Sequence, residues 1–191
     1  SKIIKIIDKG DQVSIRDLLF TSFVQESDTK KINSTLSEID YVMLDEVEKS
    51  FYLSKLEKKL QELITSIKNV KNVDRKVEML LNNFSPSFNL DGTQCFKKVD
   101  LIYKINKIYT EGIGCCSDYA RASIFLLSIL NIKARKVNNY RHTSIEYYNK
   151  DKNKWIWIDP SYRIFAYRGN DKNNKLNQFE IFSSKIYFII Y

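Results

Sequence analysis

Residues 111–130, with the sequence EGIGCCSDYARASIFLLSIL, carry the strongest structural signal in the chain. A turn with glycine at positions 112 and 114 is followed, from Ala122 to Leu130, by a segment that is apolar nearly all round. A helix with apolar residues on every side is buried in the middle of a domain, because any exposed face would contact water. The stretch therefore predicts a central buried helix that begins close to Cys116.

The segments before this helix have helical spacing. Helices are predicted over about 35–68, 74–83 and 99–109, and the first of them carries one apolar stripe at helical spacing that indicates core packing. The stripe consists of Leu53, Leu56, Leu60, Leu63 and Ile64. A short helix capped by Ser14 and a loop over 83–94 are also expected. Residues 3–7 fit either a short strand or the first turn of a helix.

After Asn131 the apolar period changes towards two, which is typical of strands. The predicted strands cover 134–140, 141–148, 154–159 and 186–191. Helices followed by an antiparallel sheet indicate an α+β fold. A length of 191 residues fits a single domain over 1–191, with a mainly helical part at 1–98 and the catalytic core at 99–191.

Composition excludes several classes of protein. The 43% hydrophobic fraction allows a sizeable core and argues against disorder. The formal charge of +8 is spread along the chain among acidic residues, so it favours solubility over a nucleic-acid surface. No apolar run approaches the roughly 20 residues of a membrane span, and no signal peptide heads the sequence. We therefore expect neither a nucleic-acid partner nor a membrane span.

The chain has three cysteines, Cys95, Cys115 and Cys116. An odd number with two neighbours does not indicate a disulfide framework, because adjacent cysteines bridge only with strain. There is no C-x-x-C pair and only one histidine, so no metal site and no cofactor are expected. Reduced thiols in the cytoplasm are the simplest interpretation. The sequence starts at Ser1 rather than Met, which leaves room for a removed targeting segment.

Cys116 stands where the buried helix begins. Unpaired amides and the helix dipole favour a thiolate at this position, and the same amides can stabilise an oxyanion on an attacked carbonyl. The alternative is a small buried hydrophobe, which is what most free cysteines are. Position alone leaves both interpretations open.

His142 and Asp159 are the candidate partners of the thiol. Imidazole titrates near neutral pH and is the usual base for a thiol, although a lone histidine can also have no role. Residues 149–153 are polar between two alternating runs and predict a hairpin. If its two-residue turn is Lys150-Asp151, His142 lies directly opposite Asp159 on the same face. An aspartate there would orient the imidazole and support its charged form.

The sequence around these residues resembles the transglutaminase-like superfamily. Residues 114–120, GCCSDYA, resemble its G-x-C-x-D-Y-A nucleophile motif; HTSIE at 142–146 and WIDPS at 157–161 resemble its histidine and aspartate strands. The resemblance covers roughly 110–162 and implies a papain-like fold with Cys116, His142 and Asp159 as catalytic triad. It also implies that Asp118 stabilises the first helical turn and that Cys115 is structural.

This resemblance implies acyl transfer or amide hydrolysis through a cysteine thioester. Water as acceptor gives a protease, amidase or deamidase, and an amine acceptor gives a transferase; the expected substrate is a peptide, a protein or an amide-containing small molecule. The alternative is a non-catalytic interaction or scaffold module that keeps the fold. The family's upstream Trp, a second oxyanion donor, has no counterpart here, and Gln94, Tyr103 and Tyr109 are candidates for its place.

Overall fold

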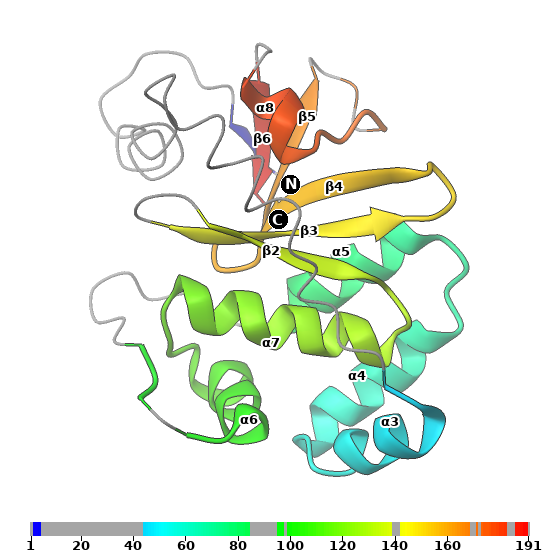
Figure 1. Ribbon diagram of the computed structural model, residues 1–191, viewed down its shortest axis with the longest axis vertical. Helices are drawn as coiled ribbons and strands as arrows, with labels where there is room; N and C mark the ends of the chain where they lie inside the picture. Colours follow the sequence, from blue (N-terminus) through cyan, green and yellow to red (C-terminus); the bar gives the residue numbers. More distant parts are fainter. Residues whose placement is uncertain are drawn as a thin grey trace.

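The computed structural model describes residues 2–4, 44–84, 95–97, 99–138, 142–168, 171, 173–182 and 186–190. The chain has an α+β fold, as predicted, with helices α3 to α7 gathered on one face of an antiparallel sheet (Figure 1). The helices are α3 (Glu46–Leu53), α4 (Lys58–Lys68), α5 (Val73–Phe84), α6 (Leu101–Glu111), α7 (Cys116–Ile129) and α8 (Gln178–Phe182). The predicted Ser14 helix, the candidate Gln94 and nearly all of the predicted 83–94 loop lie outside the described residues.

The described strands form one six-stranded sheet in the order β1-β6-β5-β4-β3-β2, with antiparallel neighbours throughout. The strands are β1 (Lys2–Ile4), β2 (Ala134–Asn138), β3 (Thr143–Asn149), β4 (Lys154–Asp159), β5 (Ile164–Arg168) and β6 (Ile186–Ile190). The start of the chain is therefore a strand, paired with β6 at the sheet edge. Strand β5 was missed because its short apolar run follows the turn at 160–163 without an alternating pattern.

Helix α7 is the centre of the core, as its sequence predicts. Its residues from Asp118 to Ala120 and from Ala122 to Ile129 are buried, and it packs on β2 and β3. The helix starts after Gly112, which has the left-handed conformation that ends α6. Gly114 also has a positive φ of 128°, and a Cβ there would lie 3.2 Å from the Phe96 ring. Glycine is thus required at the turn in front of Cys116.

The apolar stripe predicted over 35–68 is divided between two helices. The chain leaves helical structure at Ser54 and re-enters it at Lys58, so Leu53 ends α3 while Leu60 and Ile64 face the core from α4. The break is stabilised by the side chain of Asn106, which accepts a hydrogen bond from the Glu57 backbone. Helical spacing alone did not reveal it, because the apolar positions keep nearly the same phase on both sides.

The β3–β4 hairpin has a different register from the one predicted. Asn149 pairs with Lys154 and Ile145 with Ile158, so the loop contains four residues, 150–153, rather than two. The Asn149 side chain accepts hydrogen bonds from the backbone of Asp151 and Lys152 and so closes this longer loop. The predicted direct pairing of His142 with Asp159 is therefore wrong by two residues.

A buried polar cluster joins the helical layer to this hairpin. Asp74 on α5 accepts hydrogen bonds from the Tyr147 hydroxyl at 2.7 Å and the Asn149 amide at 2.6 Å, and it pairs with Lys152 at 2.9 Å. Burial raises the pKa of Asp74, but the nearby Lys175 charge and these hydrogen bonds outweigh it, so the net pKa is lowered. The carboxylate thus stays charged where the hairpin docks on α5. No helix in the described part of the chain is both long and apolar enough to cross a bilayer.

Candidate active site

Cys116 is the first residue of α7, as predicted, and its side chain is half-buried. The backbone N–H groups in the first turn of a helix have no partner within the helix, so the thiol lies at a positive end of the peptide dipoles. The glycine turn brings the chain into this position in a tight bend. The arrangement suits a thiolate and, at the same place, an oxyanion.

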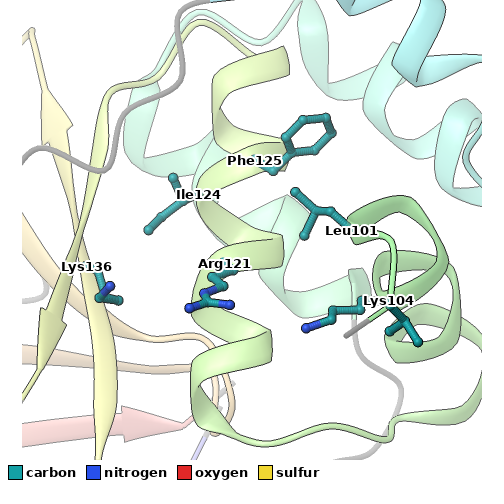
Figure 2. Close-up of a pocket in the computed structure, with 7 residues that line it drawn as sticks. Leu101, Lys104, Arg121, Ile124, Phe125 and Lys136 are labelled. Carbon is teal, nitrogen blue, oxygen red and sulfur yellow. The ribbon is translucent and has the colours of Figure 1, made fainter. Parts of the chain in front are cut away.

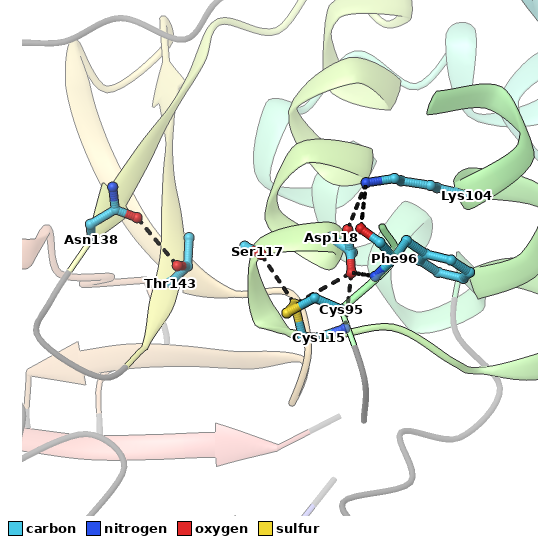
Figure 3. The surroundings of a disulfide bond; sticks show 8 residues. All are labelled: Cys95, Phe96, Lys104, Cys115, Ser117, Asp118, Asn138 and Thr143. Atoms are coloured by element: carbon cyan, nitrogen blue, oxygen red, sulfur yellow. Dashed lines mark hydrogen bonds and ion pairs between the residues drawn. A yellow bond between two sulfur atoms is a disulfide. The ribbon is translucent and has the colours of Figure 1, made fainter. Parts of the chain in front are cut away.

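The prediction of reduced thiols is wrong for two of the three cysteines. Cys95 and Cys115 form a disulfide, and Cys116 is the free cysteine (Figure 3). The pair was missed because Cys95 is 20 residues away from Cys115 in a stretch without periodicity. Cys95 and Cys115 also lie close to Asp118 in an arrangement that could hold a metal ion, but sulfurs joined to each other are not thiolate ligands. Cys115 is structural, as the resemblance implies.

Asp118 stabilises the start of α7, as expected, and does more than cap it. Its carboxylate accepts hydrogen bonds from the backbone N–H of Cys115 at 3.2 Å and of Phe96 at 2.9 Å. It also pairs with the buried Lys104 ammonium of α6 at 3.0 Å. Figure 3 shows these contacts converging beside the disulfide. The residue before Cys116 is thus fixed by a covalent bond and by a buried ion pair.

His142 and Asp159 are in contact, with 2.5 Å between Nε2 and Oδ2. Both are buried; His142 is 5% exposed and Asp159 0%. Ile145 pairs with Ile158, and continuing this register by one residue places Asp159 opposite Ser144, so His142 is its diagonal neighbour. The register error was an even number of residues, which keeps a side chain on the same face, and a diagonal pair is within reach of long side chains. The prediction brought the right residues together through the wrong pairing.

The second Asp159 oxygen is held by the turn that follows β4. Oδ1 accepts hydrogen bonds from the backbone N–H of Ser161 at 2.9 Å and of Tyr162 at 3.3 Å. The carboxylate therefore has a fixed orientation and presents its other oxygen to Nε2 of His142. The Nδ1 atom of the same ring is left for the thiol.

The electrostatics of the site favour a thiolate and an imidazolium. Burial raises the pKa of the Cys116 thiol, but hydrogen bonding with His142 and its charge outweigh this effect and, with hydrogen bonds from Thr143, lower the net pKa. Burial alone would lower the pKa of His142, but the Asp159 charge and hydrogen bond and the interaction with Cys116 raise it to about 10. The two shifts have opposite directions, and both favour the thiolate–imidazolium pair over the neutral pair.

Two further residues belong to the site. Thr143 contacts the Cys116 sulfur, and its hydroxyl oxygen also lies 3.2 Å from the Asn138 side-chain oxygen, so its single proton serves one of the two acceptors at a time. The Tyr162 ring lies 5.8 Å from the His142 ring, and burial together with the charges of Asp159 and Cys116 raises the pKa of its hydroxyl. Thr143 directly follows His142, and Tyr162 comes three positions after Asp159. This closeness in sequence is the signal by which both could have been predicted.

The two candidates on α6 for the second oxyanion donor, and the buried Trp157 of β4, each contact groups outside the Cys116 site. Tyr103 is 50% exposed, and its ring packs on Phe96 under the Lys107 ammonium. Tyr109 packs against the hydrophobic core. Trp157 is buried and donates from Nε1 to the Ser144 hydroxyl at 2.8 Å. These contacts assign none of them to the oxyanion.

Comparison with known proteins gives distant structural likenesses. No family model matches the chain, and no curated protein sequence matches it. Two crystal structures of the periplasmic domain of TgpA from Pseudomonas aeruginosa are similar to it, one of them bound to ethylmercury. Their TM-scores are 0.42 and 0.43 at 19% and 18% identity, and both cover 63% of this chain. The match spans about half of that domain, 50% and 49%.

Proposed function

We propose that this chain is a cysteine acyl enzyme that cleaves an amide or ester through a thioester on Cys116. One observation carries the proposal: a half-buried thiol at the start of α7 interacts with His142, whose other nitrogen is 2.5 Å from the buried Asp159 carboxylate. A nucleophile, a base within reach and a third group that orients the base are the parts that this chemistry needs. A non-catalytic scaffold module would not need a thiol, an imidazole and a buried carboxylate in contact with one another.

In the first half of the reaction the Cys116 thiolate attacks the carbonyl carbon of the substrate. The new carbon–sulfur bond moves an electron pair onto the carbonyl oxygen, and the N–H groups at the very start of α7 stabilise that oxyanion. Collapse of this intermediate breaks the bond to the leaving amine or alcohol. His142 gives its Nδ1 proton to the leaving group, and the acyl group remains on sulfur as a thioester.

In the second half His142 takes a proton from the acceptor, which attacks the thioester carbonyl and releases the Cys116 thiolate. Water as acceptor gives a carboxylic acid, and an amine gives a new amide. Asp159 keeps Nε2 as the donor side of the ring in both halves, so Nδ1 is always directed to the reacting atoms. We propose hydrolysis of a peptide, a protein or an amide-containing small molecule as the main reaction, with transfer by the same residues.

The disulfide bears on where this chemistry takes place. The predicted cytoplasmic location rested on reduced thiols, and the Cys95–Cys115 bond removes that support. Disulfides persist in oxidising compartments and are rare in the cytosol. We therefore favour an oxidising compartment as the place of action.

Acylation by p-nitrophenyl acetate tests the proposal. We expect one nitrophenolate to be released rapidly per chain and one acetyl group to be found on Cys116, removable by neutral hydroxylamine as a thioester is. Cys116→Ser should lose the rapid phase, and the urea-unfolded chain should show only the rate of an ordinary thiol. Equal rates for the folded and the unfolded chain would refute the proposal, because the folded structure would then not increase the reactivity of the thiol.

A further inference from the structure

A pocket of about 400 Å³ lies between α6, α7 and β2. Its volume is within the range of ligand-binding pockets. Residues of three separate segments form its walls. They are Val99, Leu101, Lys104, Arg121, Ile124, Phe125 and Lys136. Neither the triad nor the resemblance accounts for this pocket.

The charged lining residues are all basic and come from three elements. Lys136 on β2 pairs with Ile145 of β3, which is in the core, so both point to the face covered by α7. Figure 2 shows the Arg121 guanidinium on the side of α7 that faces β2, and the Lys104 ammonium reaching towards α7 from α6. No acidic residue lines the pocket among the described residues.

The three charges are not equivalent. Lys104 is neutralised by its buried pairing with Asp118. Arg121 is exposed, and the described residues give it no ion pair or hydrogen bond. Its planar guanidinium is suited to bind a carboxylate through two parallel hydrogen bonds. Among the described residues, the pocket therefore offers a site for an anion at Arg121.

Apolar walls accompany this charge. Leu101, Ile124 and Phe125 line the pocket, and Val99 is 45% exposed at its edge. Water next to these side chains is released when an apolar group replaces it, which favours binding of an amphipathic ligand over a small ion. The lining thus fits a carboxylate next to an apolar group.

The pocket and the surroundings of the nucleophile lie on the same two elements, α7 and the edge of the sheet at β2. Arg121 is five residues after Cys116 on α7, which places it about 7.5 Å further along the helix axis and about 140° further around it, at 1.5 Å and about 100° per residue. On the sheet, Lys136 is two residues from Asn138, whose side chain is hydrogen-bonded to Thr143 beside the Cys116 sulfur. An extended peptide covers the axial part of this distance in two to three residues at about 3.3 Å each, and the long Arg121 side chain turns around the helix towards β2 (Figure 2).

We propose that this pocket is a specificity subsite, which binds an acidic side chain two or three residues from the carbonyl that Cys116 attacks, with an apolar residue beside it. The inference rests on the proposed function, because it takes Cys116 as the reacting atom. The occupant is an acidic segment of a peptide substrate, held by Arg121 and packed on Leu101, Ile124 and Phe125.

A matched pair of affinity labels tests the subsite. Iodoacetyl-Leu-Glu-amide and iodoacetyl-Leu-Gln-amide both alkylate Cys116 and differ only in the charge that would meet Arg121. We expect the Glu label to react about fivefold to tenfold faster at subsaturating concentration, as one charge-assisted hydrogen-bonded contact allows. Arg121→Gln should bring the Glu-to-Gln ratio close to one. Lys150→Gln, which removes an exposed charge in the β3–β4 loop, should keep the ratio.

The ratio within each variant cancels any change in the reactivity of the thiol itself. A ratio near one in the wild-type chain, or an unchanged ratio in Arg121→Gln, would overturn the subsite. Plain iodoacetamide separates this outcome from failure of the proposed function. If iodoacetamide alkylates Cys116 faster in the folded than in the unfolded chain while the two labels react equally, the proposed nucleophile is supported and the subsite is refuted.

Discussion

Replacing Asp159 by Asn tests whether the carboxylate controls the charge of the nucleophile. In the folded chain the pKa of His142 is raised from an ordinary 6.5 to about 10, which corresponds to about 5 kcal/mol in favour of the protonated ring. The Asp159 charge and its 2.5 Å hydrogen bond are the largest causes that raise it, against the opposing effect of burial. Asp159→Asn would keep the size of the side chain but remove its charge. The pKa of His142 should then fall below its ordinary value, because the burial that lowers it remains.

The consequence for Cys116 follows from the hydrogen bonds around position 159. Asn Oδ1 can keep the bonds from Ser161 and Tyr162, and its Nδ2 then faces Nε2 of His142. The ring must accept at Nε2 and carry its proton on Nδ1, so it is neutral and no longer a base towards the thiol. Loss of the imidazolium should raise the apparent pKa of Cys116 by about one to three pH units, the usual effect of one nearby charge.

The assay is the pH dependence of alkylation by iodoacetamide. Cys95 and Cys115 are joined, so the reaction reports Cys116 alone. The rate follows the thiolate fraction, and its midpoint should move upwards in Asp159→Asn. Asp151→Asn makes the same change at an exposed position of the β3–β4 loop and should leave the midpoint in place. Superimposable profiles for Asp159→Asn and the wild type would refute the reasoning.

Three further predictions concern stability. Replacing Cys95 and Cys115 by Ser should lower the free energy of unfolding in urea by about 3 kcal/mol, because a loop of about 20 residues is then open in the unfolded chain. Tyr147→Phe removes a buried hydrogen bond to Asp74 and should cost about 1–3 kcal/mol in the same measurement. Because the folded-state pKa of His142 is raised, its stabilisation is fully present below pH 6.5 and is lost as pH rises through about 10. The difference in unfolding free energy between wild type and His142→Asn should therefore shrink from pH 6.5 to pH 10.

Matched variants separate these effects from general damage. Tyr148→Phe removes a more exposed hydrogen bond, to Asn153, and should cost less than Tyr147→Phe. Equal costs would show that the Asp74 cluster does not stabilise the hairpin. A double serine variant as stable as the wild type would contradict the cross-link prediction. For His142, a difference that grows with pH would mean that the sign of the pKa shift is wrong.

The sequence allowed good prediction of features that depend on local pattern. Helix α7 was predictable because residues that are apolar on every side leave a helix no exposed face. The contact between His142 and Asp159 was predictable because the period of a strand is two, so an even register error keeps both residues on one face. The loop length was not, because Asn149 closes a four-residue loop with its side chain.

Features that join distant segments could not be read from local pattern. The Cys95–Cys115 bond, the Lys104–Asp118 pair and the basic pocket each bring together residues whose own neighbourhoods show no sign of the contact. Their formation depends on how α6 packs against α7, which periodicity does not specify. The contact between His142 and Asp159 was thus predictable, whereas the distant contacts that support the start of α7 were not.

The disulfide next to Cys116 has a practical consequence for biochemical work. Thiol reductants are commonly added to protect a reactive cysteine during purification, and here the same reagent also attacks the Cys95–Cys115 bond. In a preparation kept in dithiothreitol, Cys116 would be protected from oxidation, but the start of α7 would have lost the cross-link that holds it. Oxygen-free buffers without thiols or phosphines protect Cys116 and leave the cross-link intact. Activities measured with and without reductant should therefore not be compared directly.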